Sequence, residues 1–152
     1  TAVMEELVWS FILFVHILAA TFWVGGQLML SVVVVPLLRR ARPELLREIA
    51  GLTGRRFTNI TNFGLLPTLV VTGILLAWHD GVRLSNLNNT DFGHVLEVKV
   101  ALVIVVFILA SLHGAAARRL SRRGVRSLAI TTMILSIAII ALAATLAVLP
   151  GP

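Results

Sequence analysis

The sequence lacks cysteine altogether among its 152 residues. Disulfide bonds, thiolate metal sites and cysteine nucleophiles are therefore excluded. Charge is also scarce, since charged residues make up 13% of the chain, whereas 58% of the residues are hydrophobic and the mean hydropathy is +0.97. A soluble domain is usually about 45–50% apolar. A globule of this size cannot bury so much apolar surface, so the expected solvent is lipid.

Lysine is nearly absent too, because Lys99 stands against twelve arginines. Eleven of these arginines fall in two clusters: Arg39, Arg40, Arg42, Arg47, Arg55 and Arg56, then Arg118, Arg119, Arg122, Arg123 and Arg126. Basic loops of membrane proteins lie on the cytoplasmic side. Both clusters are therefore predicted to be cytoplasmic, with the N- and C-termini outside. The membrane accounts for the net charge of +6, so no nucleic-acid partner is expected.

Four apolar stretches are long enough to cross a bilayer, which takes about 20 residues in a helix. They cover approximately residues 6–38, 57–78, 93–117 and 127–149. The prediction is an all-α, integral membrane four-helix bundle, a single domain over residues 1–152, placed as a multi-pass protein in the plasma membrane. No secretory signal is expected at the N-terminus, because the first stretch is too long and has no basic flank before it.

The first stretch exceeds the membrane thickness, because about 32 helical residues span ~48 Å against ~30 Å of hydrocarbon. It must tilt, protrude or break, and Pro36 is its expected end. Gly25 and Gly26 should allow close approach by another helix or a flat ligand. The basic segment at 41–53 is typical of a short amphipathic helix at the membrane surface.

The second stretch carries a proline, Pro67, within an apolar helix. A proline removes one backbone donor and frees a carbonyl of the preceding turn. Asn59, Thr61 and Asn62 lie one to two turns earlier, and their side chains are expected to satisfy such carbonyls.

Ionisable residues inside a bilayer are costly, so each requires a structural or functional reason. The candidates for a site are His16, His79, His94, Lys99 and His113. Histidine is a common ligand of metals and of haem iron. Counted from Trp9 and Phe92 as outer markers, His16 and Lys99 both lie ~10 Å deep. His79 and His94 close the two ends of an outer loop, and His113 lies in the inner half.

Each candidate also has an ordinary structural explanation. Lys99 could snorkel to the outer surface or pair with Glu97, and the histidines could be hydrogen-bonded packing groups or interfacial side chains. Helical phase places His16 and Trp23 on one face, with Gly26 beside it. Such a face would suit a porphyrin or simple helix packing.

Further positions share a face or a depth. Lys99 and His113 fall on the same side of the third stretch. His113, Met29 and Met133 have comparable inner depth, and a histidine–methionine pair can hold haem iron or copper. A second, inner centre is therefore an open alternative.

Three segments carry a family resemblance: FVHILAATFWVGGQLML, LVVTGILLA and FGHVLEVKVALVIVVFILASLHGAAARRL. Together they resemble the copper-resistance protein D family and the HemJ-type protoporphyrinogen oxidases, over most of residues 15–120. The HemJ-type resemblance implies that His16 and Lys99 belong to a haem or porphyrin site. This chain departs from that pattern at Glu97, where HemJ-type proteins usually have a histidine.

The leading functional prediction is a membrane cytochrome, an oxidoreductase that binds one or two b-type haems and carries electrons. His16 is the favoured axial ligand, the second is expected from His79, His94 or Lys99, and His113 is the candidate ligand of an inner site. A quinone or another, unidentified redox partner would accept electrons, and glycine-rich helix faces favour a homodimer. The alternatives are a copper transport or copper-handling membrane protein, a porphyrin-oxidising enzyme, and a structural protein without a cofactor.

Overall fold

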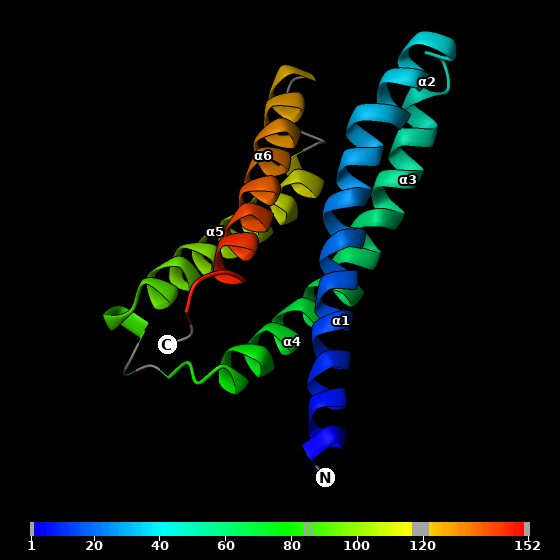
Figure 1. The fold of residues 1–152 in the computed structure, drawn as a ribbon. Helices are drawn as coiled ribbons and strands as arrows, with labels where there is room; N and C mark the ends of the chain where they lie inside the picture. The colour runs from blue at the N-terminus through cyan, green and yellow to red at the C-terminus, as the bar shows by residue number, and fades with distance from the viewer. Residues whose placement is uncertain (1, 84, 86, 117–121, 151–152) are drawn as a thin grey trace. The chain divides into compact units, whose positions relative to one another are not determined.

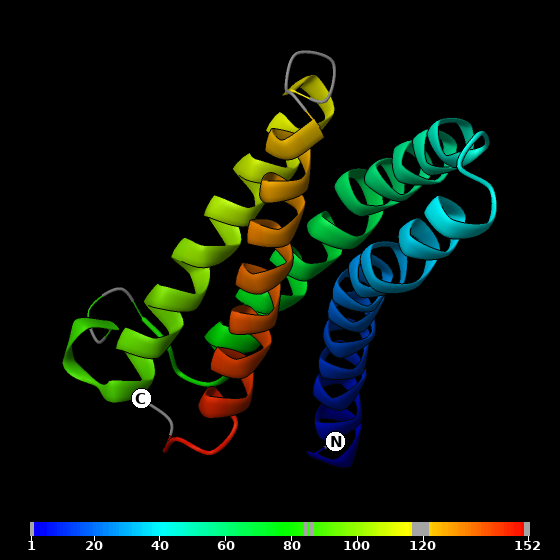
Figure 2. The ribbon, with the colours of Figure 1, turned by 90° about the horizontal axis from the view of Figure 1, so that it is seen from above.

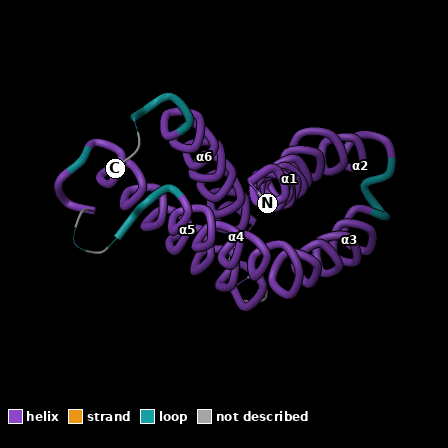
Figure 3. Tube along the Cα trace, turned by 60° about the horizontal axis from the view of Figure 1, so that its bottom comes forward, coloured by secondary structure: helices purple, strands orange, loops and turns teal. Residues whose placement is uncertain are grey.

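The computed structural model describes the backbone of residues 2–83, 85, 87–116 and 122–150, and the side chains there except those of 47, 50, 88, 111–116, 122, 123 and 125. Figure 3 shows only helices and loops in this part of the chain. The elements in order are α1 (Ala2–Leu28), the π-helix η1 (Met29–Val34), α2 (Val35–Ala41), α3 (Leu46–Ile60), the π-helix η2 (Thr61–Leu65), α4 (Leu66–His79), the 3₁₀ turn η3 (Leu87–Asn89), α5 (Asp91–Ala116) and α6 (Arg122–Leu146).

Four helical stretches are long and apolar enough to cross a membrane: Ala2–Ala41, Gly51–His79, Asp91–Ala110 and Arg126–Leu146. Their large apolar side chains are mostly exposed, as at Phe63, which is 85% exposed, and Phe11, which is 66% exposed. A lipid environment explains such surfaces, because in water they would be an aggregation hazard. The predicted all-α class and the four membrane-length helices are confirmed.

The chain divides into two compact units, Thr1–Ala77 and Trp78–Pro152. The first unit holds α1 to α4, in which α1 lies against η2 and α2 lies against α3. The second unit is built mainly from α5 and α6, which run side by side (Figures 1 and 2). Each unit therefore has its own helix contacts, and the single bundle remains a prediction.

The expectation that the first helix ends at Pro36 is wrong. The helix runs without interruption from Ala2 to Ala41, with Pro36 near the start of α2. The short amphipathic helix expected at 41–53 is the start of a longer one, because α3 begins at Leu46 and continues through η2 and α4 to His79. Proline is tolerated in a helix where the local ladder changes, and here both helices contain a π-helical turn.

Each π-helical segment ends two residues before a proline. Segment η1 ends at Val34, before Pro36, and η2 ends at Leu65, before Pro67. Widening the turn shifts the hydrogen-bond partners where the proline donates none. The π segments therefore carry both helices past their prolines.

Polar side chains near Pro67 contribute differently from what was expected. The Thr68 hydroxyl donates to the carbonyl of Gly64, over 2.9 Å. Thr61 is buried, and its hydroxyl has no hydrogen-bond partner among the described residues. The hydroxyl that donates to a backbone carbonyl of this turn is therefore that of Thr68, after the proline. The prediction that Thr61 would make such a bond is wrong.

The two glycines in the middle of α1 have different surroundings. A Cβ at Gly26 would collide with the ring of Phe57 from α3, whereas a Cβ at Gly25 would meet no atom within 4 Å. Gly26 therefore permits the predicted close approach of another helix, and the group that approaches is an aromatic ring of the same chain.

The second unit packs around the contact between α5 and α6. Val106 on α5 and Ser136 on α6 are fully buried, and Ile139 lies one turn from Ser136 in the same core. Ser136 donates to the carbonyl of Thr132 and Thr132 donates to that of Leu128, each over 2.8 Å. Small hydroxyl side chains that satisfy themselves on their own helix let neighbouring membrane helices pack closely.

Candidate functional site

The candidate site is centred on His16, the histidine in the middle of α1. Its Nδ1 lies 2.7 Å from the hydroxyl oxygen of Thr72 on α4, although the two residues are 56 positions apart. His16 is half-buried and Thr72 is buried. This histidine is thus tied to the neighbouring helix of its own unit.

Thr72 belongs to a chain of hydroxyl bonds along α4. Its hydroxyl donates to the carbonyl of Thr68 over 2.6 Å, and Thr68 in turn donates to the carbonyl of Gly64. Such back-bonding to the residue four positions earlier is common for threonine in helices. It orients the Thr72 oxygen for His16.

The next residue, Gly73, leaves room for the imidazole ring. A Cβ at this position would lie 3.2 Å from Cε1 of His16 and 3.9 Å from its Nδ1. A contact of 3.2 Å is tighter than ordinary van der Waals packing. The absence of a side chain at Gly73 therefore allows the ring to lie against α4.

The face of α1 that carries His16 is largely buried. Ala19 and Trp23, one and two turns along the same face, are 6% and 3% exposed. The predicted shared face of His16 and Trp23 is thus a buried helix face. Trp23 is a buried residue two turns along α1 from the histidine.

His79 and His94, at the two ends of the loop between α4 and α5, lie exposed near helix ends. His79 is the last residue of α4, and its Nδ1 lies 3.6 Å from a carboxylate oxygen of Asp80. His94 lies in the first turn of α5 and is exposed. A surface pair such as His79–Asp80 contributes little to stability. Both positions are accessible to water or headgroups.

A tight turn closes α4 next to His79. Gly81 has a φ of +82°, and its N–H donates to the carbonyl of Trp78 over 3.1 Å. Glycine suits this left-handed position after a helix. Arg83 donates to the same carbonyl over 3.0 Å, and its guanidinium lies 5.5 Å from the Trp78 ring. Arg83 therefore caps the C-terminal end of α4.

Lys99 and His113 both lie on α5. Lys99 is half-buried, two turns before the fully buried Val106, so it falls on the stripe that α5 directs towards its core. Among the described side chains no carboxylate lies within salt-bridge distance of Lys99, so the alternative of a pair with Glu97 is not seen. The side chain of His113 lies outside the described ones. The predicted second centre with His113, Met29 and Met133 therefore stays a prediction.

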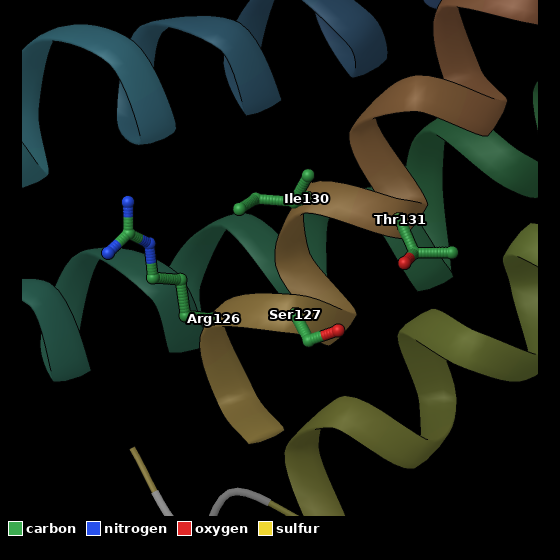
Figure 4. Close-up of a pocket in the computed structure, with 4 residues that line it drawn as sticks. All are labelled: Arg126, Ser127, Ile130 and Thr131. Atoms are coloured by element: carbon green, nitrogen blue, oxygen red, sulfur yellow. The ribbon is translucent and has the colours of Figure 1, made fainter. Parts of the chain in front are cut away.

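Among the five predicted site residues, His16 is hydrogen-bonded to another helix, through Thr72. No three histidine, aspartate or glutamate side chains gather as a metal site within the described ranges. A pocket of about 300 Å³ is lined by Arg126, Ser127, Ile130 and Thr131, which form one face of α6 (Figure 4). No predicted site residue lines this pocket.

Two residues that contact His16 were not among the predicted site residues, Thr72 and Gly73. They form the Thr-Gly pair of the segment LVVTGILLA, which carries part of the family resemblance. The signal was present as a motif, but neither residue type suggests a ligand by itself. The structure gives the pair a physical role, since one residue supplies a hydroxyl to His16 and the other supplies clearance.

Comparison with known proteins yields two informative relatives. The chain is 35% identical over 101 residues to an uncharacterized protein of Aquifex aeolicus (strain VF5), which covers 66% of this chain and 64% of that protein. It is 28% identical over 154 aligned residues to the copper transport protein CutJ of Bacillus subtilis (strain 168), which covers 99% of this chain and 27% of CutJ. The chain thus spans less than two thirds of the length of either relative.

No protein-family model matches the chain. No solved structure matches it either.

These relatives favour one of the predicted functions over the others. A distant relationship to a copper transport protein agrees with the copper side of the resemblance. The haem cytochrome gains no support from these relatives, and neither do the HemJ-type relationship, the quinone or redox partner and the homodimer, which all stay predictions. Four membrane-length helices together with this relative indicate a multi-pass membrane protein.

Proposed function

We propose that this chain is a copper-handling membrane module in which His16 is a ligand for copper in transit. The observation that carries the proposal is the alignment of 99% of the chain with part of a copper transport protein. In this proposal the Arg-rich segments lie in the cytoplasm, the termini lie outside, and the plasma membrane is the site of action.

The chemistry of the site supports a copper cargo. Neutral imidazole is a good ligand for copper, and His16 supplies one within a membrane-length helix.

The proposal is tested on the detergent-purified chain. The protein is loaded with Cu(I) under reducing conditions, and bound copper is measured by metal analysis and by competition with a coloured Cu(I) chelator. Stoichiometric copper that is lost in His16→Asn is expected. The matched control is His94→Asn, which removes an exposed histidine at a helix end and should retain the copper.

An absorption spectrum of the same protein, before and after reduction with dithionite, distinguishes the alternatives. A Soret band that sharpens into α and β bands on reduction, and that disappears in His16→Asn, would establish the haem cytochrome and refute the copper proposal. A flat spectrum with no copper in the wild-type chain would refute both.

A further inference from the structure

We infer that Thr72 is a positioning residue, which holds His16 in the tautomer with its proton on Nδ1 and so makes Nε2 the copper-binding nitrogen. The inference rests on the proposed function for the metal itself. The tautomer, however, is a property of the chain without copper and can be measured alone.

The tautomer follows from a count of protons. The Thr72 hydroxyl has one proton and makes two short contacts, with the Thr68 carbonyl at 2.6 Å and with His16 Nδ1 at 2.7 Å. A carbonyl oxygen can only accept, so the hydroxyl proton points to Thr68. The contact to His16 must then use a proton on Nδ1. In the neutral ring the lone pair is consequently on Nε2.

The surroundings keep this arrangement in place. The Thr68 carbonyl belongs to the backbone of α4, so it cannot turn away as a side chain could. Gly73 lets the ring approach within this distance of α4. The bond pairs two polar groups in an apolar environment, where leaving either unpaired would be costly.

A histidine that binds a metal usually donates its other ring N–H to a fixed acceptor, which sets the tautomer and orients the ring. Thr72 occupies the place of that acceptor for His16. Loss of such an outer partner typically weakens metal binding by about 10- to 100-fold. Without the hydroxyl, the ring can also carry its proton on Nε2, which blocks the nitrogen that would bind copper.

The tautomer is read from the protein labelled with ¹⁵N-histidine, by long-range ¹H–¹⁵N correlation of the ring nitrogens without metal. The His16 signals are assigned as those missing from His16→Asn. In the wild-type chain we expect a protonated Nδ1 and an unprotonated Nε2. A wild-type His16 with its proton on Nε2 would overturn the inference.

The decisive variants are Thr72→Val, which removes the acceptor with little change in shape, and Thr68→Val as the matched control. Thr68→Val removes a hydroxyl of the same chain of bonds but keeps the backbone carbonyl that Thr72 uses. Thr72→Val should give a mixture of tautomers and weaken Cu(I) binding about 10-fold or more. Thr68→Val and Thr72→Ser should keep the wild-type tautomer and affinity, and an unchanged His16 in Thr72→Val would contradict the role of Thr72.

Silver(I), a diamagnetic substitute for Cu(I), distinguishes the positioning of His16 from the copper function. A shift of the Nε2 signal on addition of silver(I) is expected, with Nδ1 still protonated. A shift at Nδ1 instead would overturn the inference. If the wild-type tautomer is as expected but neither silver(I) nor Cu(I) binds, the proposed copper function fails while Thr72 still positions His16.

Discussion

The two compact units use the same local chemistry for different ends. Each has a membrane helix along which hydroxyl groups donate to the carbonyl four residues earlier, Thr68 and Thr72 on α4 and Thr132 and Ser136 on α6. On α6 these side chains are buried, and this helix runs along α5. On α4 the chain of bonds ends on His16 of another helix. Back-bonded hydroxyls are therefore a packing device that becomes a site when a facing helix supplies an imidazole.

The units also differ in the regularity of their backbones. Both π-helical segments lie in the first unit, whereas α5 and α6 are regular α-helices over their described lengths. Turns of π-helix occur frequently at functional sites. Their concentration in the unit that holds His16 is consistent with a site there and with simpler packing in the second unit.

The largest effect on this comparison is expected from filling the space beside Phe57. Gly26→Leu would force its side chain into that ring and should destabilise the first unit by about 3 kcal/mol, the upper end for overpacking. Gly25→Leu is the matched control, because a Cβ at Gly25 would meet no atom within 4 Å. The free energy of unfolding in mixed micelles measures both, and equal losses would mean that the contact of Gly26 with Phe57 is not specific.

A smaller effect should separate packing from copper binding. Ser136→Leu inserts a large side chain into the fully buried contact of α5 and α6 and should cost about 2 kcal/mol of stability. Since the site lies in the first unit, the affinity for Cu(I) should stay within about threefold of the wild type, or ~0.6 kcal/mol. Chelator competition and unfolding are measured on the same preparation.

The opposite pattern is expected for Thr72→Val, with a larger loss of affinity than of stability. If Ser136→Leu weakened copper binding as strongly as Thr72→Val does, the two chains of hydroxyls would not differ in function. The two units could then not be distinguished by their roles in copper binding.

The sequence was sufficient for the class of the fold and the number of long helices, because apolar length is a local property. It misplaced the ends of the first two helices, since proline usually interrupts a regular helix. The π-helical turns before Pro36 and Pro67 remove that conflict. No local pattern indicates a change in helix type, because the residues that form these turns are ordinary apolar and small polar ones.

The candidate site could be predicted only in part, for a similar reason. The depth of His16 was predicted by counting residues along one helix, and it stays a prediction. Its contact with Thr72 depends on how α1 and α4 are rotated and shifted relative to each other, which no local pattern specifies. The Thr-Gly motif was visible, but a threonine in an apolar helix indicates packing until a partner 56 residues away is known.

The smallest effect is expected at Gly73, where the ring of His16 lies close without a clash. In Gly73→Ala the new methyl group would lie 3.2 Å from Cε1, so the ring must move by a few tenths of an ångström. The bond to Thr72 should lengthen but persist, and Cu(I) affinity should fall by less than the roughly tenfold loss expected when an outer partner is removed.

Gly64→Ala, on the same run of helix but with no atom within 4 Å of the new methyl group, should leave affinity unchanged. Equal affinities for the two variants would mean that the ring of His16 does not rest on α4 in solution. A loss in Gly73→Ala alone would show that clearance for the ring, as well as the hydroxyl of Thr72, makes the first unit a site.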